Sequence, residues 1–333
     1  YISIAAIAST LSLIGQQNTI TVFISKNKSV LSVLSLFSIT CSIISCIAIF
    51  LLFDRIDVGL LAIGFVIFAH GVASNLGYQN YKKYTIYAII QKGLMVIFAL
   101  SLLNSFGVEW VLLGIALSYF VYFKNFINGL MRFKIDFSEL KKNKKFILTN
   151  YGIMMTSITT NQIDKILIVP ILGFAVLGNY SLAIQVITIM CILPSVVFKY
   201  VLPRASRQIV DTKLRRDVIL LSCALSVGVF FVSPYIIPIF FDKFTEVVGI
   251  IQIMSFSIIP ITINYFYLSK FLSSENAVIP LIGGIISSVV LIGGMIGLGS
   301  LYGATGIAIT HVLTYSTMCT VSYVMNRMTK DQD

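Results

Sequence analysis

Polar side chains that could bind a solute gather on one predicted helix, residues 146–172. At about 100° per residue, seven of them share one face about 140° wide. They are Thr149, Asn150, Thr156, Ser157, Thr160, Asn161 and Asp164. The other side of the helix is covered by Met155, Ile158, Ile163 and Ile166. Lipid cannot satisfy the polar face, so it must point into protein or water. The pattern predicts a polar site within the membrane, and we expect Thr156, Thr160, Asn161 and Asp164 to line it.

Two adjacent charges, Asp164 and Lys165, lie inside this helix, and Asp164 is the only acidic residue well inside any predicted span. Each charge costs about 2.5–3.5 kcal/mol at mid-membrane on insertion scales. Asn161 precedes them by three and four residues, so its side chain can bridge to either one. Two interpretations remain open, a lumenal polar site or an interhelical ion pair that locks the bundle.

Three other titratable groups lie inside predicted spans. Lys92 comes nine residues after Lys83, so it either faces a cavity and meets an anion or extends back to the headgroups. His70 and His311 are candidates for proton coupling, because histidine titrates near neutral pH. The alternative for each histidine is an interhelical hydrogen bond without a transport role.

Enzyme chemistry is not indicated. The sequence has no paired carboxylates, no metal-type spacing of ligands and no glycine-rich phosphate loop after a strand. Its five cysteines all lie in apolar runs and suggest neither a metal site nor redox chemistry. We therefore predict a protein that is not an enzyme and has no metal and no cofactor.

The elements that position these residues are membrane spans. Of the 333 residues 57% are hydrophobic and only 11% are charged, whereas soluble proteins have about a quarter charged residues. Apolar runs of at least 18 residues, long enough to cross a bilayer, recur along the chain. We predict an all-α polytopic membrane protein with spans at 1–24, 29–53, 58–77, 84–104, 107–127, 146–172, 175–198, 217–240, 247–268, 277–298 and 303–325.

The net charge of +11 follows membrane topology and does not indicate a nucleic-acid partner. Of the 24 Lys and Arg residues, 20 fall in alternate loops and at the C-terminal end, whereas the opposite loops hold only Arg55 and Lys243. Basic loops stay in the cytoplasm. We therefore expect a multi-pass protein of the cytoplasmic membrane, with a cytoplasmic C-terminus and with Tyr1 on the outside.

The basic loop 128–145 divides the predicted spans into two sets. We expect an incomplete N-terminal lobe at 1–127, a cytoplasmic linker at 128–145, a C-terminal lobe at 146–326 and a tail at 327–333. A further helix upstream of Tyr1 would give the N-terminus a cytoplasmic start and complete two bundles of six helices, an organisation typical of transporters.

Two stretches resemble a known family. Residues 161–168 (NQIDKILI) and 177–183 (LGNYSLA) are similar to the seventh and eighth helices of bacterial polysaccharide-biosynthesis flippases. These are the Wzx-type O-antigen and capsule members of the multidrug/oligosaccharidyl-lipid/polysaccharide exporter superfamily. Residues 15–18 (GQQN) are similar to that family's second helix, which brings Gln17 and Asn18 among the expected lumen residues.

The resemblance implies a twelve-helix transporter, here without its first helix, that moves an undecaprenyl-diphosphate-linked oligosaccharide outward by alternating access. Membrane lipids and other polysaccharide assembly proteins are the implied partners. In that family a cationic lumen attracts the diphosphate, and Lys92 and Lys165 are the basic residues inside spans here. The basic residue that often follows the glycine in the second helix is absent at 21–23, although Lys26 and Lys28 could substitute for it.

Two other functions remain as alternatives. An ion-coupled multidrug or metabolite exporter of the same fold would favour several buried carboxylates in the first half, and none lies deep there. A membrane polymerase or acyltransferase of the same pathway would need a large external loop, which the predicted spans do not leave room for.

The charge asymmetry predicts which loops face the cytoplasm. Single cysteines placed at Lys142, Arg207 and Asp331 should resist an impermeant thiol reagent in intact cells and react after the membrane is opened. A cysteine at Lys243, in a loop predicted to be external, is the matched control and should react in intact cells. Labelling of the first three positions without permeabilisation would contradict the predicted orientation.

Overall fold

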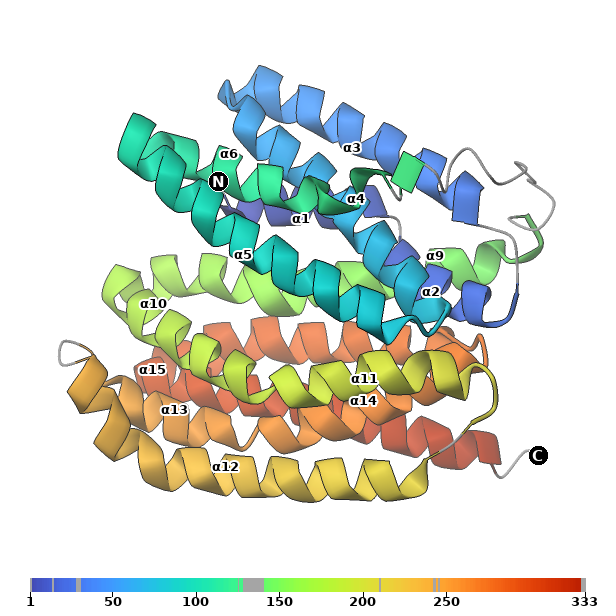
Figure 1. The fold of residues 1–333 in the computed structure, drawn as a ribbon. Coiled ribbons are helices and arrows are strands. Elements are labelled where there is room, and N and C mark those ends of the chain that lie inside the picture. The colour runs from blue at the N-terminus through green and yellow to red at the C-terminus, as the bar shows by residue number, and fades with distance from the viewer. Residues whose placement is uncertain are drawn as a thin grey trace. The chain divides into compact units, whose positions relative to one another are not determined.

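The computed structural model describes residues 2–13, 15–27, 31–124, 126–127, 141–209, 211–241, 244 and 246–330. Every regular element in these ranges is a helix (Figure 1). The chain separates into two compact units, Tyr1–Met155 (unit 1) and Thr156–Asp333 (unit 2). This division falls inside the helix that the sequence analysis assigned whole to the C-terminal lobe. Most of the predicted linker, residues 128–140, lies outside the described residues.

Unit 1 is organised around one helix. Its elements are α1 (Ile2–Leu13), α2 (Gln16–Ser25), α3 (Leu31–Phe53), α4 (Ile56–Gly77), α5 (Tyr81–Phe106), η1 (Val108–Trp110), α6 (Val111–Ser118), η2 (Tyr119–Tyr122) and most of α9 (Lys144–Ile158). Helix α4 packs against α1, α2, α3 and α6. Its glycines permit this close packing, because Gly59 lies against Cys46 of α3 and Gly71 lies against the Tyr122 ring.

The first predicted span, 1–24, is not one continuous helix. It breaks at Gly15, whose φ of 70° is left-handed, a conformation that glycine adopts at low cost. A side chain there would also collide with the backbone of Asn150 and Tyr151 in α9. The predicted span 107–127 is interrupted as well, because 3₁₀ turns flank the eight residues of α6.

Unit 2 contains the end of α9, the π-helical turn η3 (Thr159–Ile163) and six labelled helices. These are α10 (Asp164–Met190), α11 (Ile192–Ala205), α12 (Thr212–Phe240), α13 (Val247–Ser255), α14 (Ile258–Ser273) and α15 (Val278–Lys330). Two of them are divided by glycines with non-helical backbone, α10 at Gly173 and α15 at Gly303. The two arms of α15 pack closely, since a Cβ on Gly294 would lie only 2.5 Å from Thr310.

The loop predicted at 199–216 is shorter than expected. Helix α11 continues to Ala205 and α12 begins at Thr212, so only 206–211 connect them. The predicted span 175–198 is likewise made of two helices, because α10 ends at Met190 and α11 begins after a turn at Cys191.

Length and composition confirm an all-α polytopic membrane protein. Six of the described helices can cross a membrane, or seven if α13 and α14, which meet at a 41° bend, form one span. Two of the six are the long segments Lys144–Met190 and Val278–Met328, which the breaks at Gly173 and Gly303 divide. The first segment contains the predicted span 146–172 and the first part of 175–198, and the second corresponds to the predicted spans 277–298 and 303–325.

Close packing at Gly71 predicts a large effect from a single added methyl group. A Cβ there would lie 2.3 Å from the Tyr122 ring, and this tyrosine is fully buried. Gly71→Ala should therefore destabilise the protein by about 1–3 kcal/mol through overpacking. Gly93→Ala in α5 is the matched control, because nothing lies within 4 Å of its Cβ position. It should be neutral or slightly stabilising, since alanine favours helix. Thermal unfolding in detergent measures both, and equal melting temperatures would contradict the packing.

Candidate functional site

The π-helical turn Thr159–Ile163 changes the geometry of the predicted polar face. A π turn closes an i→i+5 ring, so residues after it are rotated from the positions that about 100° per residue would give. Thr149 and Asn150 are buried within unit 1, whereas Ser157 and Asn161 are exposed and Asp164 is buried. The seven polar residues therefore do not form one continuous surface.

Asp164 lies inside unit 2 and is only 1% exposed. Its Oδ2 accepts a hydrogen bond from the Tyr180 hydroxyl at 2.8 Å, and its Oδ1 accepts one from the Lys165 backbone N–H, also at 2.8 Å. Tyr180 follows the break at Gly173, so the carboxylate joins the two arms of α10. The sequence analysis left an interhelical ion pair open, but no described basic side chain forms an ion pair with Asp164.

His311 and Tyr315, on the second arm of α15, extend this group. The His311 ring meets the Tyr180 ring edge-on, with centroids 6.5 Å apart, and lies 4.9 Å from the Tyr315 ring. His311 is buried, and its Nδ1 has no hydrogen-bond partner among the described residues. We call Asp164, Tyr180, His311 and Tyr315 the Asp164 cluster.

The chemistry available to the Asp164 cluster follows from its burial. A buried carboxylate is costly unless its charge is compensated. Both hydrogen bonds to Asp164 stabilise the ionised form, but they bring no positive charge. The carboxyl group can therefore hold a proton or attract a small cation. Tyr180 bonds it directly, and His311, the titratable imidazole of the cluster, contacts Tyr180 through its ring.

Lys165 points away from Asp164. Its Nζ donates to the backbone carbonyl of Asn161 at 3.1 Å. The sequence analysis allowed the Asn161 side chain to bridge to Asp164 or to Lys165. In the structure this side chain bonds neither of them and donates instead to the Ser157 carbonyl at 2.7 Å. Lys165 is half-buried, while Ser157 and Asn161 are exposed. These three residues form a polar, cationic surface at the π turn.

Thr156 and Thr160 make contacts within the helix and with a neighbouring helix. Thr160 donates to the carbonyls of Thr156 and Ser157, at 3.2 Å each. Thr156 lies against Gly284 in the first arm of α15, where a Cβ would lie 2.3 Å from its hydroxyl oxygen. This threonine is therefore at a close helix contact within unit 2.

His70 of unit 1 is held by α3. Ser35 Oγ lies 3.2 Å from its Nδ1 and Ser38 Oγ lies 2.7 Å from its Nε2. The ring also packs edge-on against Phe126, with centroids 5.6 Å apart. Both nitrogens thus have hydroxyl partners, which favours the interhelical interpretation of this residue.

The other predicted site residues of unit 1 are dispersed. Lys92 is exposed on α5 and forms no ion pair with a described residue, whereas its neighbour Gln91 is buried and donates to Ser118 at 3.1 Å. Gln17 and Asn18 are half-buried at the start of α2. Gln16 beside them is fully buried and donates to the Leu34 carbonyl at 2.7 Å.

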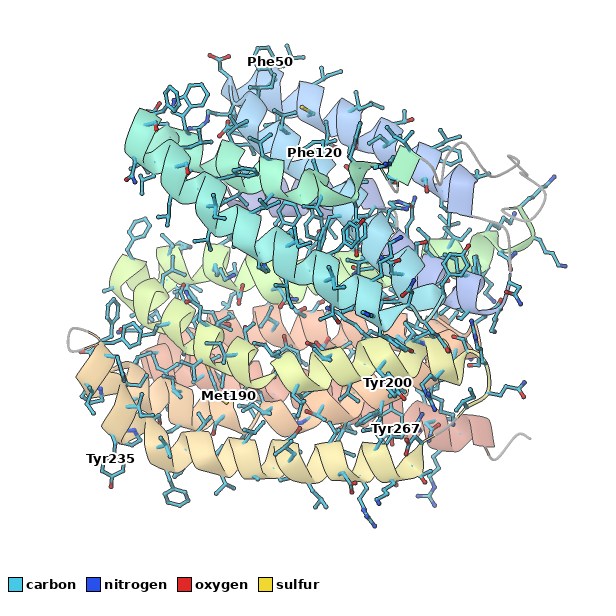
Figure 2. All side chains as sticks on the ribbon, viewed as in Figure 1. Phe50, Phe120, Met190, Tyr200, Tyr235 and Tyr267 are labelled. Atoms are coloured by element: carbon cyan, nitrogen blue, oxygen red, sulfur yellow. The ribbon has the colours of Figure 1, made fainter. Side chains whose placement is uncertain are left out.

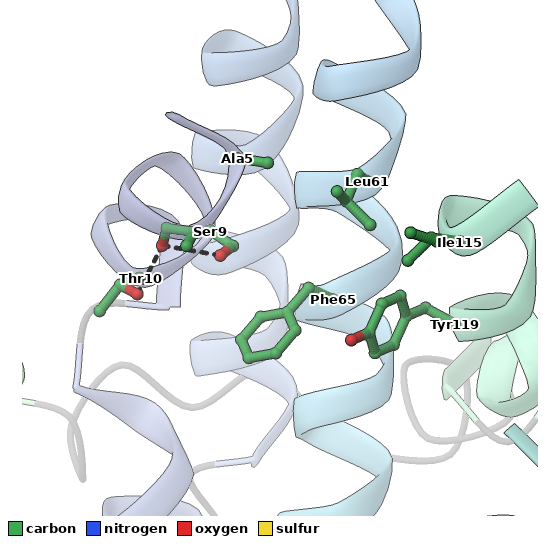
Figure 3. Close-up of a pocket in the computed structure, with 8 residues that line it drawn as sticks. Ala5, Ser9, Thr10, Leu61, Phe65, Ile115 and Tyr119 are labelled. Carbon is green, nitrogen blue, oxygen red and sulfur yellow. Dashed lines mark hydrogen bonds between the residues drawn. The ribbon is translucent and has the colours of Figure 1, made fainter. Parts of the chain in front are cut away.

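Unit 1 also contains a pocket of about 200 Å³ between α1, α4 and α6 (Figure 3). Its walls are mostly apolar, with Leu61, Phe65 and Ile115 opposite Ser9 and Thr10. The two hydroxyls donate to the Ala6 carbonyl. None of the site residues predicted from the sequence lines this pocket.

No protein-family model matches the chain, and no curated protein sequence matches it. Solved structures do match, over 98% of the chain. A multidrug resistance MATE transporter of the MOP superfamily in an outward-facing conformation is 15% identical, with a TM-score of 0.75 and 84% of its own length covered. A MOP superfamily transporter from Pyrococcus furiosus is 14% identical, with a TM-score of 0.76 and 85% covered. A MATE structure in a bent conformation is 13% identical, with a TM-score of 0.76 and 84% covered.

The chain has the fold of MATE transporters. The resemblance drawn from short sequence motifs is confirmed as a likeness of fold to these transporters, while the flippase identity remains a prediction. The likeness covers both units, although the identity is too low to carry over residue roles.

Sequence reasoning did not find the partners of Asp164 and His70 in this MATE fold. Tyr180 lay in a motif used only for the resemblance, 177–183. These partners lie on another helix or another helix arm, and no local sequence pattern identifies them.

The hydrogen bond between Tyr180 and Asp164 predicts a specific loss of stability. Tyr180→Phe leaves a buried carboxylate oxygen without a partner and should cost about 1–3 kcal/mol. Tyr235→Phe is the matched control, because this tyrosine is 75% exposed on α12 and points outward (Figure 2). Thermal unfolding in detergent gives the comparison. Combining Tyr180→Phe with Asp164→Asn should reveal coupling, and additive effects would contradict the bond.

Proposed function

We propose that this protein is a flippase that moves a lipid-diphosphate-linked oligosaccharide across the cytoplasmic membrane by alternating access. The observation that carries the proposal is the surface of Lys165, Asn161 and Ser157 at the π turn. It lies in a chain with a transporter fold and offers a cation next to amide and hydroxyl groups.

This combination suits the proposed cargo. The diphosphate brings negative charge, and a lysine ammonium binds it more strongly where water is scarce than at a wet surface. Sugar hydroxyls both donate and accept hydrogen bonds, as the Asn161 amide and the Ser157 hydroxyl do. Because the backbone carbonyl of Asn161 holds the Lys165 ammonium at 3.1 Å, that cation is positioned without a competing carboxylate.

The Asp164 cluster supplies a means of coupling in this proposal. Uptake of a proton or cation at Asp164 would neutralise the buried carboxylate and weaken its bond to Tyr180, which joins the arms of α10. Binding of an ion would thus weaken the hydrogen bond that joins the two arms of α10 across the break at Gly173. In this proposal His311, whose ring meets the Tyr180 ring edge-on, is the second group of the cluster that takes up a proton.

An ion-coupled multidrug or metabolite exporter is the second candidate. It is favoured by one solved structure of the same fold, which is described as a multidrug resistance transporter. A lumen for cationic drugs would use carboxylates, and the buried Asp164 could serve in that way if Tyr180 released it. The two candidates differ in whether Lys165 or Asp164 meets the cargo.

Removing the lysine charge tests the flippase. Lys165→Ala should lower surface polysaccharide about tenfold or more at unchanged membrane abundance, because a bond to a charged group is worth about 1.5–3 kcal/mol. Lys165→Arg should retain part of the export. The assay is complementation of a strain that lacks its own flippase, with polysaccharide and protein measured together.

Lys82→Ala provides the matched control, since this lysine is exposed at the start of α5, and it should export normally. Full export by Lys165→Ala would refute the assignment of the lysine to the cargo. Efflux of a cationic dye that requires Asp164 but not Lys165, without any effect on polysaccharide, would instead establish the exporter.

A further inference from the structure

The end of unit 2 where α11 passes into α12 carries a dense group of cations: Lys199, Arg204, Arg207, Lys213, Arg215 and Arg216. Three of these, Lys213, Arg215 and Arg216, occupy the first turns of α12. A helix N-terminus is positive and disfavours cations, and Asp211 already caps this one by accepting from the Leu214 N–H. The three cations are therefore repelled by the positive end of α12, and a bound anionic ligand would reduce this repulsion.

Arg215 has no carboxylate partner among the described residues. Its guanidinium lies 5.8 Å from the centre of the Phe266 ring of α14. Its Nε is buried without a hydrogen-bond partner there. The nearest acidic residue along the chain, Asp217, pairs with Arg216 at 3.3 Å. The Arg215 guanidinium therefore keeps its charge without a carboxylate beside it in the described part of the chain. Because the residue is only half-buried, the outer edge of the guanidinium remains accessible to an anion.

Arg204 lies in the same part of unit 2. Its guanidinium is 4.9 Å from the centre of the Tyr200 ring on α11, which Figure 2 labels where α11 passes α14. Tyr200 packs on the apolar cluster that contains Phe266, Val201 and Val218. The two arginines therefore rest on aromatic faces of one cluster. Stacking on a ring leaves the edge of a guanidinium available for bidentate contact with a phosphate.

We propose that Arg204 and Arg215 bind the phosphate of an anionic phospholipid from the surrounding bilayer. Apolar side chains of the same two helices, Val196 and Leu220, lie eight residues before Arg204 and five after Arg215, and they are 47% and 60% exposed. They lie about 8–12 Å along the helices from the arginines, where acyl chains would run from the bound headgroup. The charge asymmetry assigns this end to the cytoplasmic leaflet, whose surface is negative. The site does not depend on the proposed cargo.

The test is lipid binding to the purified full chain in a neutral detergent, followed by native mass spectrometry and by thermal shift. Phosphatidylglycerol should bind and stabilise, and phosphatidylcholine should do so far less. Arg204→Gln and Arg215→Gln should each weaken phosphatidylglycerol binding about tenfold, as expected for one charged hydrogen bond. Arg207→Gln, an exposed arginine in the same connection, removes the same charge and should bind as the unaltered protein does.

Three results would overturn the proposal. The first is equal loss of binding in Arg207→Gln, which would indicate general attraction to a basic loop. The second is unchanged affinity in both glutamine variants. The third is displacement of phosphatidylglycerol by inorganic phosphate at equal concentration, which would indicate a soluble anion. Arg215→Lys covers the case that Arg215→Gln does not fold: it keeps the charge but loses the planar fork, so reduced affinity supports the site and full affinity opposes it.

Discussion

The structure depends on one constraint: a polar group within an apolar span must find its partner inside the protein, because lipid offers none. In the described spans, buried polar groups satisfy this constraint mainly through uncharged partners. The His70 ring takes two serine hydroxyls of α3, and the Gln91 amide takes Ser118. Asp164 takes Tyr180. Each of these bonds joins helices or helix arms that the sequence separates, so polar groups and glycine contacts together determine which helices become neighbours.

Breaks in the helices supply the exceptions that function can use. A regular α-helix occupies its own carbonyls, but the π turn at 159–163 contains the Asn161 carbonyl, which accepts a hydrogen bond from the Lys165 ammonium. Gly173 turns the chain so that Tyr180 returns toward Asp164. Irregular backbone at membrane depth is tolerated where protein or water satisfies it. The two charges of one dipeptide thereby obtain different surroundings, one buried against a phenol and one half-exposed beside amides.

Much of the fold could be predicted from the sequence because span length and charge asymmetry are strong local signals. The gap predicted between 172 and 175 contains the break at Gly173. The break at Gly15 was missed, because the interpretation by span length joined residues 1–24 across Gly15 and the polar residues 16–19. The close approach of the α9 backbone to Gly15 is not visible in the sequence. The π turn was missed for a related reason, because a constant angle per residue cannot register a wider turn. The partners of Asp164 and His70 depend on packing between helices, which no period encodes.

The class of cargo follows from side chains and not from the fold. Transporters with this fold share only 12–15% identity with the chain, so the fold by itself does not identify the cargo. What differs between a cationic drug and a glycosyl diphosphate is the sign of the charge to be compensated. Here the carboxylate is buried and engaged with Tyr180 and a backbone amide, whereas the ammonium of Lys165 is half-exposed beside groups that bind hydroxyls. A side chain must be accessible to contact a cargo, and Lys165 is more accessible than Asp164. This difference in access is the reason that the proposed function assigns the cargo to Lys165 and not to Asp164.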